Sequence, residues 1–191
     1  AHKRMNMEQN VIQKNMWNIA GTAGLALGAV STAYLFLTQW IGMAGTPAFV
    51  SMLVNMVLWV AKTGGCIWLM MLFMKKFSAA VPEADNSATF RMGIITALLS
   101  ALVYSAFSFA NVAFIYPDIF AEQFDAVMQQ MAPMLDSNTS AEVEKTLQNL
   151  PQITFFSNLI YCSLYGTIVA FAISRVVPSK DPFADYKPED Q

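Results

Sequence analysis

The chemistry available to this chain begins with one lysine in an apolar setting. Lys62 lies in the stretch WVAKTGGCIW (59–68), and no other charged side chain stands between Lys14 and Lys75. An ammonium group in such surroundings is costly, so it normally pairs with a carboxylate, binds an anion or lines a water-filled path. Lys62 is therefore the first candidate for a functional site.

Four interpretations of Lys62 remain open. Its ammonium can hydrogen-bond to carbonyls or hydroxyls within a helix bundle, meet a carboxylate of a partner subunit, line a path for an anion or a proton, or bind a lipid phosphate through a sideways cavity. On its own helix, Asn55 shares its face and Gly65 leaves room beside it. Asn111 and Asn158, in later apolar segments, complete the predicted intramembrane polar site.

Other reactive groups are scarce. His2 is the only histidine, and Cys66 and Cys162 lie in apolar segments, so we expect no metal site and no cofactor. The chain contains no P-loop, no HExxH and no GxSxG motif, and no carboxylate pair in an apolar segment. These features predict a protein that is not an enzyme.

Composition indicates that the elements around Lys62 lie in lipid. Hydrophobic residues make up 55% of the 191 residues and charged residues only 13%, against about 25% in ordinary soluble domains. The charges are also segregated, with none between Arg91 and Asp118 or between Lys145 and Arg175. A soluble bundle needs a polar face on each helix, so charge-free runs of this length predict an integral membrane protein. The net charge of −2 offers no basic stripe for nucleic acid.

The hydrophobic segments predict an all-α, four-helix transmembrane bundle. We expect one membrane domain over residues 1–176, followed by a disordered tail over 177–191, which has three prolines and little apolar content. The expected spans cover residues 16–40, 48–74, 90–116 and 152–174. Lys75 and Lys76 are expected to end the second span, and a polar loop to follow.

The basic residues predict the orientation of the bundle. Of the 11 Lys and Arg, three lie before the first span, three at 75–91 and three from Arg175 onward, whereas the 117–151 connection carries only Lys145. Basic residues concentrate on the cytoplasmic side of a membrane. We therefore expect a multi-pass protein of a bacterial inner membrane with both termini in the cytoplasm.

Small residues predict where helices approach closely. Gly24 and Gly28 form a GxxxG pair in the first span, and Gly166 begins a similar pattern in the fourth. Such spacing allows backbones to come together, and Gly65 is a further helix-packing candidate. We expect packing within the bundle, although the same faces can drive dimerisation.

The long third connection predicts a periplasmic helical hairpin at about 118–150. Its first helix is amphipathic, and TSAE announces a second, because Thr139 and Glu142 have capping-box spacing. The docking face of the hairpin comprises Phe120, Phe124, Met128 and Met131. Methionines at this spacing can bind Cu(I), but packing is the preferred interpretation, because Pro133 interrupts the helix.

Several stretches carry a family resemblance. IYPDIFAEQFDAVMQQMAPML, TSAEVEKTLQNLP and FFSNLIYCSLYGTIVAFAISR lie between residues 115 and 175. With the charge-ended second span, they resemble the bacterial integral membrane family called domain of unknown function 4199, over roughly residues 17–175. The resemblance implies a four-helix inner-membrane protein, supplies no catalytic residue and suggests a role beside lipid-linked sugar synthesis.

Two functions follow as hypotheses. The first is a non-enzymatic accessory or scaffold protein that acts through helix packing and the hairpin, with membrane lipids around it and a membrane protein or a second copy as partner. The alternative is a small oligomeric permease or lipid-handling protein that uses Lys62 in a polar intramembrane cavity. Four spans are few for a transporter monomer, so the alternative requires an oligomer.

Overall fold

The described part of the chain is built from helices. The computed structural model describes residues 2–81, 84–131, 133, 142–143, 145–146 and 148–177. The elements are α1 (His2–Met43), α2 (Ala48–Ala80), α3 (Asn86–Ala110), the π-helix η1 (Asn111–Ile115), α4 (Pro117–Met131) and α6 (Leu150–Val176).

Four of these helices are long and apolar enough to cross a membrane. The candidate spans are Asn10–Met43, Ala48–Ala80, Asn86–Ile115 and Leu150–Val176. The all-α class is confirmed, and the four predicted spans correspond to four helices that could cross a membrane. The helices run beyond the predicted spans at most of their ends, because a helix continues into water wherever its residues favour it, whereas hydropathy marks only the part in lipid.

The helix of the second span continues past the residues that were expected to end the span. α2 does not end at Lys75 and Lys76 but continues to Ala80, with Phe77 fully buried in the core. Lysine is a good helix former, so two exposed lysines end the lipid-facing part of the helix without ending the helix itself. The connection to α3 is correspondingly short, and α3 starts at an N-cap in which Asp85 accepts a hydrogen bond from the Ala88 N–H at 2.7 Å.

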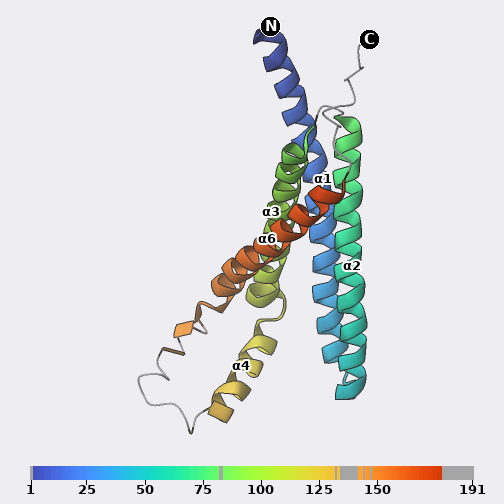
Figure 1. Cartoon of the computed structure of the whole chain (residues 1–191). Coiled ribbons are helices and arrows are strands. Elements are labelled where there is room, and N and C mark those ends of the chain that lie inside the picture. The colour runs from blue at the N-terminus through green and yellow to red at the C-terminus, as the bar shows by residue number, and fades with distance from the viewer. Residues whose placement is uncertain are drawn as a thin grey trace, which may run out of the picture.

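Both ends of the bundle have a distinct character. α1 begins, α2 ends, α3 begins and α6 ends at one end, while the α1–α2 turn and α4 lie at the other (Figure 1). We call the first the basic end, because Lys14, Lys75, Lys76, Arg91 and Arg175 lie in the segments that meet there. We call the second the α4 end.

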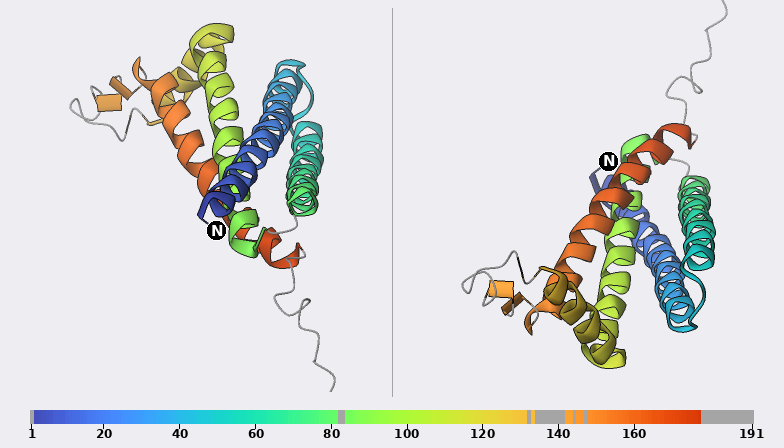
Figure 2. Two further views of the ribbon diagram at one scale, coloured as in Figure 1. Left: turned by 90° about the horizontal axis from the view of Figure 1, so that it is seen from above. Right: turned by 90° about the horizontal axis from the view of Figure 1, so that it is seen from below.

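α3 is the central helix of the bundle. It packs on α6 on one side and on α1 on the other, whereas α2 packs mainly on α1 and only lightly on α3 and α6. Figure 2 shows α1 between α2 and the α3–α6 pair in views from both ends. The core concentrates toward the basic end, where Met70, Met74 and Phe77 of α2 meet Met92 of α3 and Ala170 of α6.

Glycines set the close contacts of α3. A Cβ added at Gly24 would lie 2.5 Å from the Cβ of Leu99, and one at Gly28 would lie 2.7 Å from the Cβ of Val103. One at Gly166 would lie 2.6 Å from the Cβ of Ala97. All three therefore lie in contacts within the bundle. Gly65 does not: a Cβ there would meet nothing within 4 Å, so the structure gives it no packing role.

The predicted hairpin is only partly described. α4 begins at Pro117 and follows η1, and among the described elements η1 is the one with which it makes more than a marginal contact. None of its residues is buried. Phe120, Phe124 and Met128 are half-buried, while Met131 is exposed. The predicted turn and parts of the second helix, Thr139 among them, lie outside the described residues, as does the predicted tail beyond Val177.

Candidate functional site

Lys62 lies between two aromatic rings. Its Nζ is 5.4 Å from the ring centroid of Tyr34 on α1 and 5.9 Å from that of Tyr104 on α3. The face of an aromatic ring carries negative charge, so both tyrosines attract the ammonium. Each distance is close to the limit of about 6 Å for a useful cation–π contact, so the attraction is modest.

The lysine also lines a crevice to which all four spans contribute. Its volume is about 110 Å³. Its smallest lining residues include Ala97, Ser100 and Gly166. Its largest include Trp59 and Tyr161, which are both exposed. The lining residues are Leu27, Ser31, Trp59, Lys62, Thr63, Cys66, Ile67, Met70, Ala97, Ser100, Tyr161, Cys162, Tyr165, Gly166 and Val169. Because α2 and α6 touch only lightly and their aromatic residues here are exposed, the crevice opens sideways between these two helices.

No acid neutralises the ammonium. None of the four spans contains Asp or Glu. In the described part of the chain, no hydrogen-bond acceptor and no carboxylate contacts Nζ of Lys62, so the rings of Tyr34 and Tyr104 are the groups that attract the ammonium. Cys66 and Cys162 line the same crevice and are both free thiols, and Sγ of Cys66 lies 4.0 Å from Oγ of Ser31. The site therefore combines a cation, two rings, hydroxyls and thiols, and lacks a counter-anion.

A polar seam joins α1 and α3 on the α4 side of the crevice. It consists of buried polar groups: Asn111 donates from Nδ2 to Oε1 of Gln39 at 2.8 Å, and its own Oδ1 is buried without a partner. The hydroxyl oxygens of Thr32, Ser105 and Ser108 are likewise buried and unpartnered in the described structure. Unpaired polar atoms in a low-dielectric interior are unfavourable, so these groups lower the stability of the α1–α3 interface.

The seam ends where the helix geometry changes. η1 starts at Asn111, whose carbonyl accepts the Tyr116 N–H at 2.9 Å, five residues on. π-turns are rare and are found frequently at functional sites. Here the π-turn lies at the point where α3 gives way to α4, and it holds the buried amide of Asn111 against α1.

The structure separates the predicted polar residues. Only Lys62 lines the crevice; Asn111 lies in the seam, and Asn55 and Asn158 line neither. Oδ1 of Asn55 is buried and unpartnered. Sequence reasoning missed the two tyrosines. A signal for them exists, because Ser31, Tyr34 and Thr38 on α1 and Ser100, Tyr104, Ser108 and Asn111 on α3 recur every three or four residues in apolar spans.

Comparison with known proteins gives one match. The model of a family described as "Protein of unknown function (DUF4199)" matches residues 21–175. The match includes Lys62, both tyrosines and the residues that line the crevice. No curated protein and no solved structure matches the chain.

Proposed function

The chain belongs to this family of unknown function, and we propose that it is a non-enzymatic accessory or scaffold protein of the membrane that holds a partner helix against the α2–α6 crevice, with one acidic side chain of that helix reaching in to Lys62. One observation carries the proposal: the ammonium stands in a crevice that opens sideways, with two neutral rings beside it and no acid in any span.

The two cation–π contacts do not offset the cost of placing Lys62 in the membrane, so the site favours a counter-anion. A lysine at the centre of a span disfavours insertion by about 2.5–3.5 kcal/mol. A cation–π contact returns about 0.5–1 kcal/mol, or ~2 when fully desolvated. Two long contacts, at 5.4 and 5.9 Å, therefore recover only part of the penalty. A carboxylate at the same depth would neutralise the charge, as intramembrane charges usually require.

The carboxylate must come from a different protein. Each copy of this chain offers Lys62 and no Asp or Glu in any span, so no span of a second copy can supply the carboxylate. A lipid-linked substrate is less well supported, because a volume of about 110 Å³ admits a few waters or one side-chain terminus. The crevice thus favours a partner helix with an Asp or Glu over the lipid-handling or permease alternative.

The placement in the cell belongs to the same proposal. We infer a bacterial inner membrane with the basic end in the cytoplasm and α4 on the periplasmic side, because the basic residues meet at one end of the bundle. The apolar face of α4 can then bind the periplasmic surface of the inner membrane or the partner protein. The family resemblance makes the membrane enzymes of lipid-linked sugar synthesis the first class of partner to search.

Site-directed photocrosslinking in cells tests the proposal. A photoreactive phenylalanine at Tyr161 or Tyr165, on the α6 side of the crevice, should capture one protein whose transmembrane segment contains Asp or Glu. Lys62→Met should abolish capture. The matched control is Phe156, which is exposed on α6 but does not line the crevice, and should capture only lipid.

A charge exchange makes the test decisive. Lys62→Asp should lose the partner, and the reciprocal acid-to-lysine change in the partner should restore it. Capture that persists in Lys62→Met, or a captured protein without an intramembrane acid, would contradict the proposal.

A further inference from the structure

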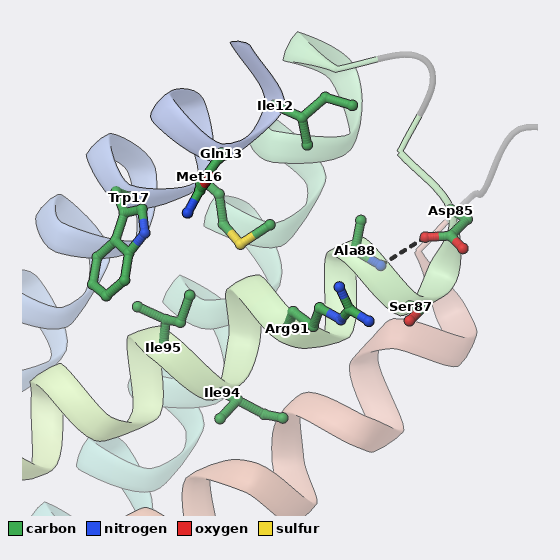
Figure 3. A pocket seen from close by; sticks show the side chains of 10 residues that line it. All are labelled: Ile12, Gln13, Met16, Trp17, Asp85, Ser87, Ala88, Arg91, Ile94 and Ile95. Carbon is green, nitrogen blue, oxygen red and sulfur yellow. Dashed lines mark hydrogen bonds between the residues drawn. The ribbon is translucent and has the colours of Figure 1, made fainter. Parts of the chain in front are cut away.

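A second, larger cavity lies at the basic end, between the early part of α1 and the start of α3. Its volume is about 720 Å³. Gln13 of α1 and Arg91 of α3 are polar residues of its wall, while Met16, Ile94 and Ile95 are apolar ones. Figure 3 shows side chains from both helices facing this space, with Asp85 and Ser87 at its loop side. Its wall is therefore polar toward the loop and apolar toward the middle of the bundle.

The position of the cavity matches the headgroup layer of a membrane. Trp17 lines it and is 52% exposed, and tryptophans near span ends mark the membrane–water interface. Arg91 is exposed and lies five residues after α3 begins at Asn86, in the first turns of that span. A cation and an indole N–H thus line the same cavity at interfacial depth, together with apolar side chains.

The guanidinium of Arg91 is available to bind an anionic ligand. In the described part of the chain no carboxylate forms an ion pair with Arg91. Asp85 also lines the cavity, but its Oδ1 accepts the Ala88 N–H at 2.7 Å, so this carboxylate is engaged as the helix cap (Figure 3). The Gln13 amide adds a neutral donor from α1.

We propose that this cavity binds the phosphodiester headgroup of an anionic phospholipid. The Arg91 guanidinium matches two phosphate oxygens, the amide of Gln13 and the indole of Trp17 supply further donors, and Ile94 and Ile95 contact the start of the acyl chains. The apolar wall favours a lipid over a soluble phosphate compound, which would leave that wall exposed to water. This site shares no residue with the Lys62 crevice, so neither proposal depends on the other.

Lipid retention by the full chain tests the site. The protein in mild detergent is titrated with phosphatidylglycerol or phosphatidylcholine and the bound lipid is counted by native mass spectrometry. Arg91→Gln should lower the preference for phosphatidylglycerol about fivefold, the effect of one basic residue near an anionic lipid. Arg91→Lys should fall between wild type and Arg91→Gln, because it keeps the charge and loses the two-pronged contact.

Two further variants separate a built site from general attraction to the basic end. Arg175→Gln removes the same charge at the same end of the bundle, from a guanidinium that lies 4.9 Å from the Phe171 ring and does not line the cavity, so lipid preference should not change. Asp85→Asn keeps a capping side chain but removes a negative charge from the cavity wall, so phosphatidylglycerol binding should increase.

Three results would overturn the proposal. One is wild-type phosphatidylglycerol preference in Arg91→Gln at an unchanged melting temperature. Another is an equal loss in Arg175→Gln, which would indicate diffuse attraction to the basic end. The third is displacement of the bound lipid by inorganic phosphate alone, which would assign the cavity to a soluble phosphate compound.

Discussion

Replacing Lys62 with methionine should stabilise the isolated protein while abolishing its association with a partner. The lysine carries a penalty of about 2.5–3.5 kcal/mol at the middle of a span. Its contacts with Tyr34 and Tyr104, at 5.4 and 5.9 Å, lie near the outer limit of the interaction and together return about 1–2 kcal/mol. In the unfolded state the ammonium is released from the bundle and can reach the micelle surface, whereas methionine fills a similar volume without charge, so Lys62→Met should raise the free energy of unfolding by about 1–2 kcal/mol.

The assay is reversible unfolding in mixed micelles, in which a denaturing detergent replaces a mild one and helicity is followed by circular dichroism. A double-mutant cycle with Tyr34→Leu isolates the cation–π contact. The tyrosine exchange should cost about 0.5–1 kcal/mol more in the wild-type background than in Lys62→Met. Tyr34→Phe is the matched control, because it keeps the ring and should leave the coupling intact.

The opposite sign would refute the reasoning. If Lys62→Met unfolds more easily than wild type, the ammonium is a net stabilising member of the bundle, satisfied by groups of its own chain. A lysine that serves only the fold should behave in this way. A lysine retained for a partner should instead destabilise the free protein, as functional sites often do.

The remaining predictions concern packing, topology and the seam. Gly24→Ala should lower the free energy of unfolding by about 1–3 kcal/mol, because its Cβ would lie 2.5 Å from the Cβ of Leu99, whereas Gly21→Ala, with nothing within 4 Å, should be neutral or stabilising in the same assay. A cysteine at Ala44, in a background without native cysteines, should react with an impermeant thiol reagent on intact cells, and one at Ser87 only after lysis; the reverse pattern would invert the topology. Asn111→Ala removes the 2.8 Å hydrogen bond to the half-buried Gln39 of α1 and should cost about 0.5–1.5 kcal/mol; an unchanged unfolding curve would show that this bond contributes nothing to stability.

The sequence by itself was enough to predict an all-α protein with four helices that could cross a membrane, because lipid allows few backbone structures. An apolar run without charge must satisfy its backbone internally, so length and hydropathy are enough to count helices. The same reasoning singled out Lys62, since a charge within such a run is conspicuous without any structure. The GxxxG pair at Gly24 and Gly28 was also visible, because small residues at this spacing mark close helix contacts.

Only the tertiary structure decided which faces meet and what surrounds the lysine. Inside a membrane no hydrophobic force selects helix pairs, so a small-residue pattern predicts a contact without naming its partner. The packing of α1 between α2 and α3 brings Tyr34 and Tyr104 to Lys62, and Asn55 and Asn158 do not line the crevice. The π-turn at Asn111, whose amide is hydrogen-bonded to α1, likewise could not be predicted from the local sequence.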